Sequence, residues 1–107
     1  MTYSVRWTEK ASSDYLEVVD YLKSRWGDRS AEKFIDKVDK QISLIQEMPS
    51  LYPASEFFQG LRRCVLAKQI SMYYLEVEVT KEIIIIRLYD NRRDTSELEE
   101  FIEEMDI

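Results

Sequence analysis

The stretch EIIIIRLY, residues 82–89, decides the fold of this 107-residue chain, and it runs directly into DNRRD at residues 90–94. Residues 83–86 are four consecutive isoleucines, a pattern typical of a central strand covered on both faces rather than of an edge strand. Because one layer can cover only one face, the pattern requires that something pack on each side of the sheet.

Segments that precede this strand in the chain supply its neighbours in the sheet. Residues 61–68 and 69–79 read as two strands that form an antiparallel meander with residues 82–89. Within 69–79 the apolar alternation shifts by one near Tyr74, which indicates either a bulge or a stretch covered on both faces. Residues 3–7 alternate between apolar and polar and predict a short first strand, which pairs most simply beside one of the later strands.

Two helices are predicted between the first strand and the meander. Thr8 is a plausible N-cap for a first helix that ends at Gly27, with an apolar stripe at helical spacing. Ser30 is the expected cap of a second helix, which ends at Met48 because a residue before proline is pushed out of the helical region. The short connection predicts an antiparallel helical hairpin, with Trp7 and Trp26 as core anchors.

A capping box at Ser96 and Glu99 predicts a short final helix at about 96–106. The fold class is therefore α+β, with a strand, a two-helix hairpin, a three-stranded antiparallel meander and a short C-terminal helix. The length predicts a single domain over residues 1–107.

Composition excludes several classes of site. The chain has no histidine and one cysteine, Cys64, so zinc sites, Ser-His-Asp triads and Cys-His nucleophiles are excluded. Its two glycines cannot supply a phosphate-binding loop, and we expect no cofactor and no metal. A polar start and the lack of a long apolar run predict a cytoplasmic protein that does not enter the membrane.

The net charge of −6 comes entirely from the end of the chain. Residues 96–107 hold six acidic and no basic side chains, whereas residues 1–95 hold 15 of each. This acidic segment is either a mask that docks on a basic surface or the solvated end of an amphipathic helix.

The order of elements and several motifs together resemble the RelE/ParE superfamily of toxins from bacterial toxin–antitoxin modules, often labelled plasmid stabilisation factors. The resemblance covers nearly the whole chain. It rests on YSVRWT at 3–8 followed by Ala11, WG at 26–27, Pro49 with YP at 52–53, GLRR at 60–63, YYLEV at 73–77, and IIIIRL at 83–88 running into DNRRD.

One branch of this superfamily implies an enzyme. RelE-like toxins enter the ribosome and cut messenger RNA with basic and tyrosine side chains that stabilise phosphate charge. The resemblance gives Arg62, Lys68, Arg93 and Tyr89 as the catalytic candidates. Against this branch, Ser71 stands where a RelE-type arginine is expected, and no histidine is present for general acid work.

The other branch implies a protein contact. ParE-like toxins poison DNA gyrase and cleave nothing themselves, and the candidates for target binding are Arg63, Arg87 and Arg92. The charge distribution favours this branch: residues 1–95 are neutral overall and residues 96–107 are acidic. Ribosomal RNA phosphates would repel such a protein from the ribosomal site. We expect Arg87 to meet a carboxylate such as Asp90, Glu76 or Glu78, or a ligand phosphate.

Either branch implies a cognate antitoxin with a flexible tail that wraps over the toxin. The expected apolar groove lies between the helical hairpin and the sheet edge, lined by Tyr15, Val19 and Leu22 with the first strand. Arg62, Arg92 and Arg93 are expected beside it. A homodimer and a heterotetramer with the antitoxin both stay open, as does an inactive homologue that serves as an interaction module.

Overall fold

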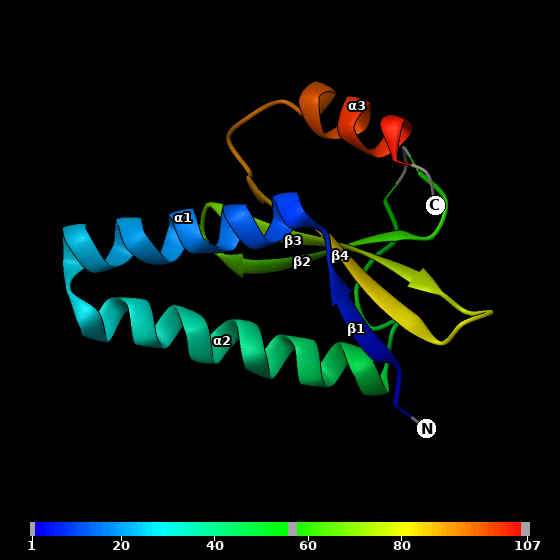
Figure 1. Ribbon diagram of the computed structural model, residues 1–107, viewed down its shortest axis with the longest axis horizontal. Helices are drawn as coiled ribbons and strands as arrows, with labels where there is room; N and C mark the ends of the chain where they lie inside the picture. The colour runs from blue at the N-terminus through cyan, green and yellow to red at the C-terminus, as the bar shows by residue number, and fades with distance from the viewer. Residues whose placement is uncertain (1, 56–57, 106–107) are drawn as a thin grey trace.

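The computed structural model describes residues 2–55 and 58–105. Along the chain its elements are β1 (Ser4–Trp7), α1 (Glu9–Trp26), α2 (Asp28–Glu47), β2 (Leu61–Ala67), β3 (Ile70–Val77), β4 (Glu82–Asp90) and α3 (Ser96–Glu104) (Figure 1). The α+β class and the predicted order of elements are confirmed. Among the residues described, no helix has the length and apolar character needed to cross a membrane.

The four strands form one sheet in the order β1-β4-β3-β2. β1 runs parallel to β4, and the other neighbouring pairs are antiparallel. β4 is therefore flanked on both sides, and every residue from Ile83 to Tyr89 is buried, as the isoleucine run predicts.

The shift of alternation near Tyr74 has both of the causes left open by the sequence. Tyr73 pairs with Arg87 while Tyr74 pairs with Ile85, so Ile86 of β4 lies between the two pairs as a bulge. The same part of β3 is also buried on both faces, from Ser71 to Leu75. A second irregularity, in β2, lies between Val65 and Ala67.

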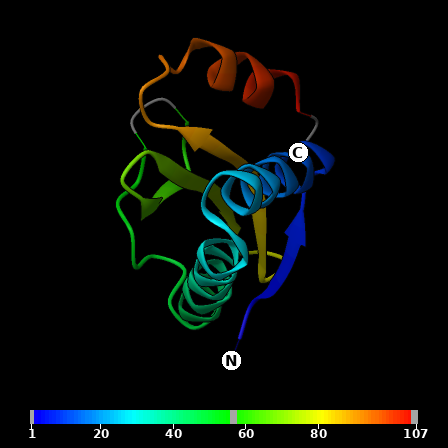
Figure 2. The ribbon, with the colours of Figure 1, turned by 90° about the vertical axis from the view of Figure 1, so that its left-hand side faces the viewer.

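Two apolar clusters sandwich the sheet. The helical hairpin of α1 and α2 covers one face and α3 lies across the other (Figures 1 and 2). On the α3 side, Leu98 and Ile102 are buried against Ile84 and Ile86. Full burial of such a side chain is worth about 1.5–3 kcal/mol, which makes these two residues the main anchors of α3.

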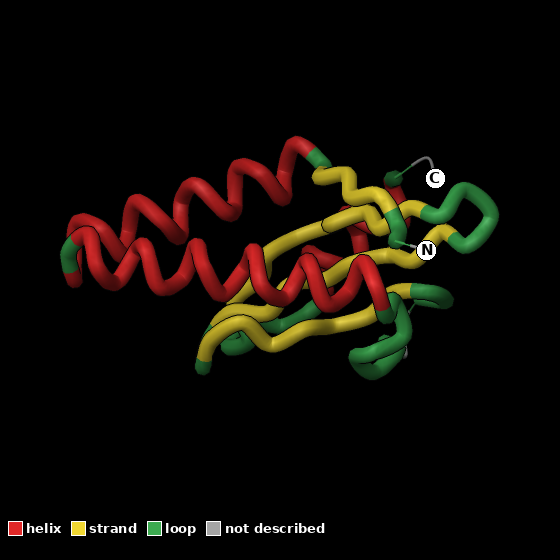
Figure 3. Tube along the Cα trace, turned by 90° about the horizontal axis from the view of Figure 1, so that it is seen from below, coloured by secondary structure: helices red, strands yellow, loops and turns green. Residues whose placement is uncertain are grey.

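The helix boundaries differ in detail from the prediction. Thr8 caps α1, and its Oγ1 accepts a hydrogen bond from the Ala11 amide at 3.0 Å. Gly27, with φ of 95°, ends α1 and directly precedes α2, so Ser30 lies inside α2 and does not cap it. This left-handed conformation favours glycine, and it turns the chain in one residue (Figure 3).

Other boundary predictions are also corrected. Lys68, Gln69 and Val79 lie in turns at the ends of β2 and β3 rather than in strands. Thr95, not Ser96, precedes α3, and the Ser96 amide donates to the Asp94 carboxylate at 2.9 Å. Asp106, predicted in the last helix, lies outside the described residues.

Trp26 was predicted as a core anchor, and this is wrong. Its side chain is 65% exposed at the end of α1, where the Arg25 guanidinium lies 5.8 Å from its ring centre. Trp7 does pack against the core, as predicted.

Candidate functional site

A groove of about 530 Å³ runs along the second half of α1. One wall is formed by Tyr21, Leu22 and Trp26 of α1, and the other by Lys68 and Ile70 near the β2–β3 turn. Tyr21 and Trp26 are 59% and 65% exposed, so two aromatic rings face solvent at this groove. Exposed aromatic side chains of this kind are frequent energetic anchors of protein interfaces.

The groove differs in position from the one predicted. Only Leu22 of the three predicted residues lines it, and the groove faces the β2–β3 turn instead of the first strand. Tyr15 packs between the rings of Trp7 and Phe34, with ring centroids 5.4 and 6.1 Å away. Tyr15 and Val19 both pack against the core beneath α1. A side chain used in this way supports α1 and does not form the wall of an open groove.

Charges at the groove are partly neutralised. Arg92 bonds both carboxylate oxygens of Asp90, at 3.0 and 2.7 Å, and this contact lowers the pKa of Asp90 to about 2. Lys68 has no carboxylate partner in the part of the chain that the structure describes. The groove thus offers apolar and aromatic surface that also carries the Lys68 ammonium group and the Glu17 carboxylate.

Arg87 lies inside the fold. Its guanidinium donates to both oxygens of Asp14 on α1, at 2.6 and 3.2 Å, and both residues are buried. The rings of Tyr89 and Phe101 lie 5.4 and 5.3 Å from it. The carboxylate that satisfies Arg87 is therefore Asp14 rather than Asp90, Glu76 or Glu78, because α1 crosses β4 just beyond the end of β1. With 4% of its surface exposed, Arg87 is engaged in holding the fold together.

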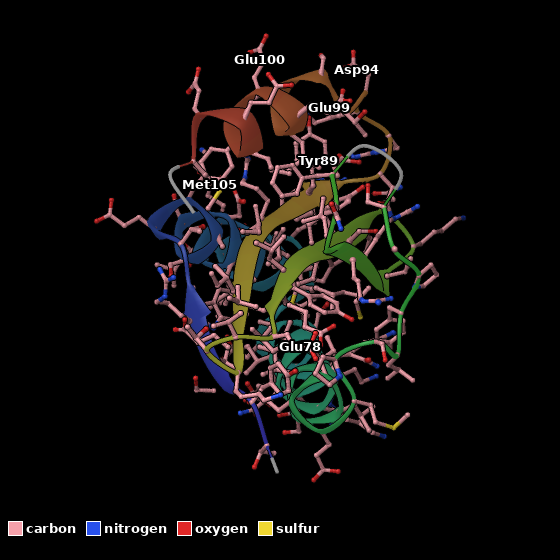
Figure 4. All side chains as sticks on the ribbon, turned by 90° about the vertical axis from the view of Figure 1, so that its right-hand side faces the viewer. Glu78, Tyr89, Asp94, Glu99, Glu100 and Met105 are labelled. Atoms are coloured by element: carbon pink, nitrogen blue, oxygen red, sulfur yellow. The ribbon has the colours of Figure 1, made fainter. Side chains whose placement is uncertain are left out.

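Arg93 and Tyr89 meet on the α3 side of the sheet. The Arg93 guanidinium lies 5.0 Å from the Tyr89 ring centre and forms an ion pair with Glu97 of α3. The Tyr89 hydroxyl donates to the Asp94 carbonyl at 2.8 Å. Figure 4 shows Tyr89 beneath α3, with Glu100 pointing away from the sheet. α3 is thus an amphipathic helix whose acidic side faces mainly outward.

Arg62 lies elsewhere, beside the loop that follows α2. It donates to the Tyr52 carbonyl at 2.7 Å and lies 3.9 Å from the Glu76 carboxylate. Lys68 is at the groove, Tyr89 is buried under α3, and Arg93 lies half-exposed beside the Tyr89 ring at the start of α3. The four RelE-type candidates thus have three different sets of contacts, although the Asn91 amide donates to the Gln69 carbonyl at 2.7 Å and brings the loop of Arg93 beside the turn of Lys68. Arg62, Arg92 and Arg93 likewise do not share the single surface that was expected.

A second cavity, of about 470 Å³, opens beside β2. Arg63, Val65 and Tyr73 lie on one side of it, and residues 52–55 and Thr95 complete its lining. The Arg63 guanidinium donates to Ser71 Oγ at 3.0 Å and to Asn91 Oδ1 at 3.3 Å. Arg63 was predicted as a target-binding residue, whereas Ser55, Thr95 and Asn91 were missed. Only the position of Asn91 inside the DNRRD motif could have indicated it.

No cluster of candidate metal ligands occurs among the residues that the structure describes. Residues 5–95 match the family of ParE toxins of the type II toxin–antitoxin system parDE. The chain belongs to the ParE toxin family.

The ParE assignment agrees with similarity to solved structures. A chain of the chromosomal ParDE toxin–antitoxin system from P. aeruginosa is 25% identical, with a TM-score of 0.66 over 83% of this chain and 96% of that one. A mutant of the E. coli toxin RelE in the free state has the same fold, with 13% identity and a TM-score of 0.63 over 97% of this chain and 94% of that one. A YoeB/ParE toxin from Agrobacterium tumefaciens is 12% identical, with a TM-score of 0.62 over 81% and 96% of the two chains. No curated protein sequence matches the chain significantly.

Proposed function

We propose that this chain is a toxin that acts by binding a protein target, DNA gyrase, and that a cognate antitoxin neutralises it. The observation that carries the proposal is that the RelE-type candidates are engaged in different contacts and do not converge on one another. RNA cleavage requires several groups around one ribose and phosphate, and Arg62, Lys68 and the Arg93–Tyr89 pair lie in three different environments. The 25% identity to the P. aeruginosa ParDE chain supports the same branch.

The groove beside α1 is the proposed antitoxin site. Its exposed Tyr21 and Trp26 rings and the half-buried Leu22 suit the apolar side of a partner segment that becomes ordered on binding. Several similar structures are toxin–antitoxin complexes, among them E. coli RelBE and DinJ-YafQ. We expect the partner to present apolar side chains to α1 and an acidic side chain to Lys68.

Two assays with the purified protein test the proposed target. In the first, DNA gyrase is incubated with plasmid DNA and the chain, and loss of supercoiling or accumulation of cleaved DNA is measured. In the second, primer extension maps cuts in translating messages. We expect an effect in the first assay only. Cuts that are lost on Arg93→Ala would instead establish a ribosome-dependent endoribonuclease.

Growth of cells that express the chain without its antitoxin provides a further test. We expect growth to stop. Normal growth at high expression, together with no effect on gyrase or on messages, would mean that the chain is an inactive homologue serving as an interaction module.

A further inference from the structure

Arg63 differs from the other arginines of the sheet and its following loop in what it contacts. Arg6, Arg62, Arg87, Arg92 and Arg93 each lie within 4.0 Å of a carboxylate. Within residues 2–55 and 58–105, Arg63 has no such partner, and it donates instead to the neutral oxygens of Ser71 and Asn91. Its positive charge is therefore held in place but not neutralised.

The two neutral contacts orient the guanidinium and leave part of it available. Nε donates to Ser71 and one Nη2 hydrogen to Asn91, so among the described residues both Nη1 hydrogens and the second Nη2 hydrogen have no acceptor. Ser71 is fully buried, and its hydroxyl lies 2.6 Å from the same Asn91 oxygen. An arginine fixed in this way offers a flat pair of donors that matches the two oxygens of a carboxylate.

The cavity next to Arg63 has the composition of a small anion site. Its apolar lining comes from Pro53, Ala54, Val65 and the rings of Tyr52 and Tyr73, and Ser55 and Thr95 also line it. The Thr95 hydroxyl donates to the Glu99 carboxylate at 3.3 Å, so the group that would bind an anion is the Arg63 guanidinium. The lining contains no acidic side chain among the residues described. Burial raises the pKa of Tyr73, so its hydroxyl is protonated at neutral pH.

We propose that this cavity binds a single carboxylate of a protein partner, supplied by an acidic residue with small apolar neighbours. One arginine matches one negative charge. A nucleic acid would instead bring several phosphates toward a protein of net charge −6 whose acidic helix α3 begins next to Thr95. This carboxylate site rests on the proposed function in one respect, namely that the molecule bound by the toxin is a protein.

The edge of β2 leaves room for the backbone of such a segment. Residues 53–55 pair with the first part of β2, through the Arg63 amide to the Pro53 carbonyl and the Ser55 amide to the Leu61 carbonyl. Val65, two residues further along, is 52% exposed at the cavity. An extended segment that continues past Val65 would place a side chain over the Arg63 guanidinium.

A titration with short peptides followed by NMR tests the site directly. The probe is acetyl-Ala-Asp-Val-amide, and its matched control is acetyl-Ala-Asn-Val-amide. We expect the Asp peptide to shift the Arg63 Nε–Hε resonance in a saturable way, and the Asn peptide to bind about tenfold more weakly or not at all. Arg63→Gln should lose about tenfold in affinity, whereas Arg29→Gln, which removes the same charge from an exposed site on α2, should not.

Ser71→Ala provides a second variant that keeps the charge. It should weaken binding of the Asp peptide several-fold, because Arg63 loses a positioning contact, while the remainder of the spectrum stays native. Equal binding of both peptides, no saturable shift up to about 10 mM, or tighter binding of uridine monophosphate than of the Asp peptide would overturn the proposal. None of these results depends on gyrase inhibition, so the proposed function is tested separately.

Discussion

At the residue scale, the contact between Arg87 and Asp14 joins α1 to the central strand. The Arg87 guanidinium donates to both carboxylate oxygens of Asp14, and Asp14 also accepts a hydrogen bond from the Leu88 amide at 3.2 Å. Their burial means that loss of either partner leaves an uncompensated charge inside the protein.

Asp14→Ala should therefore lower the free energy of unfolding by about 3–5 kcal/mol, measured by urea denaturation. The double change Asp14→Leu with Arg87→Met should recover most of the loss, because no unpaired charge remains. Arg6→Ala, at an exposed pair with Glu82, is the control and should cost at most about 1 kcal/mol. A loss at Asp14 no larger than at Arg6 would contradict a structural role for the buried pair.

The contact between Asp90 and Arg92 predicts how the free energy of unfolding depends on pH. Arg92 lowers the pKa of Asp90 from 3.8 to about 2 in the folded protein. A group whose pKa is depressed by folding stabilises the fold above its unfolded pKa, and this stabilisation is lost as pH falls through the folded pKa. The free energy of unfolding should thus fall between about pH 4 and pH 2, and Asp90→Asn should reduce that dependence. Identical pH profiles for the two proteins would show that the Arg92 contact contributes nothing in solution.

At the scale of the elements, α3 is held by apolar contacts rather than by its charges. Leu98 is fully buried between α3 and the sheet, while Glu100 points to solvent (Figure 4). The acidic side chains that distinguish α3 in the sequence therefore contribute little to its packing against the sheet.

Leu98→Ala should lower the free energy of unfolding by about 2–5 kcal/mol, since it removes buried methyl groups and leaves a cavity. Glu100→Ala should change it by less than about 0.5 kcal/mol. Thermal or urea unfolding of both variants measures the difference. A larger effect at Glu100 than at Leu98 would mean that electrostatic contacts hold the helix.

At the scale of the whole molecule, the groove beside α1 combines an exposed helix surface with the β2–β3 turn and the end of β4. Trp26→Ala and Tyr21→Ala should each weaken binding of the cognate antitoxin by about tenfold or more, as truncated interface anchors do. Both side chains are exposed, so the free energy of unfolding should hardly change.

Isothermal titration with the antitoxin measures this effect. Leu16→Ala removes a side chain that is 60% exposed on the same helix but does not line the groove, and it should bind like the unaltered protein. An unchanged affinity for both aromatic variants would place the antitoxin elsewhere on the toxin.

The sequence by itself determined the elements and the covered central strand, because helical and strand periodicity, Thr8 and Gly27 act over a few neighbouring residues. Strand geometry alone also places the neighbouring residues Arg62 and Arg63 on opposite faces of the sheet, since successive strand residues point to opposite faces. The tertiary structure alone decided the partner of Arg87, which is 73 positions away in the chain. It also decided the exposure of Trp26 and the separation of the arginines. All three features depend on strand register, on the bulge at Ile86 and on where α1 crosses the sheet. The sequence does not reveal them because contacts between distant segments leave no periodic pattern in it.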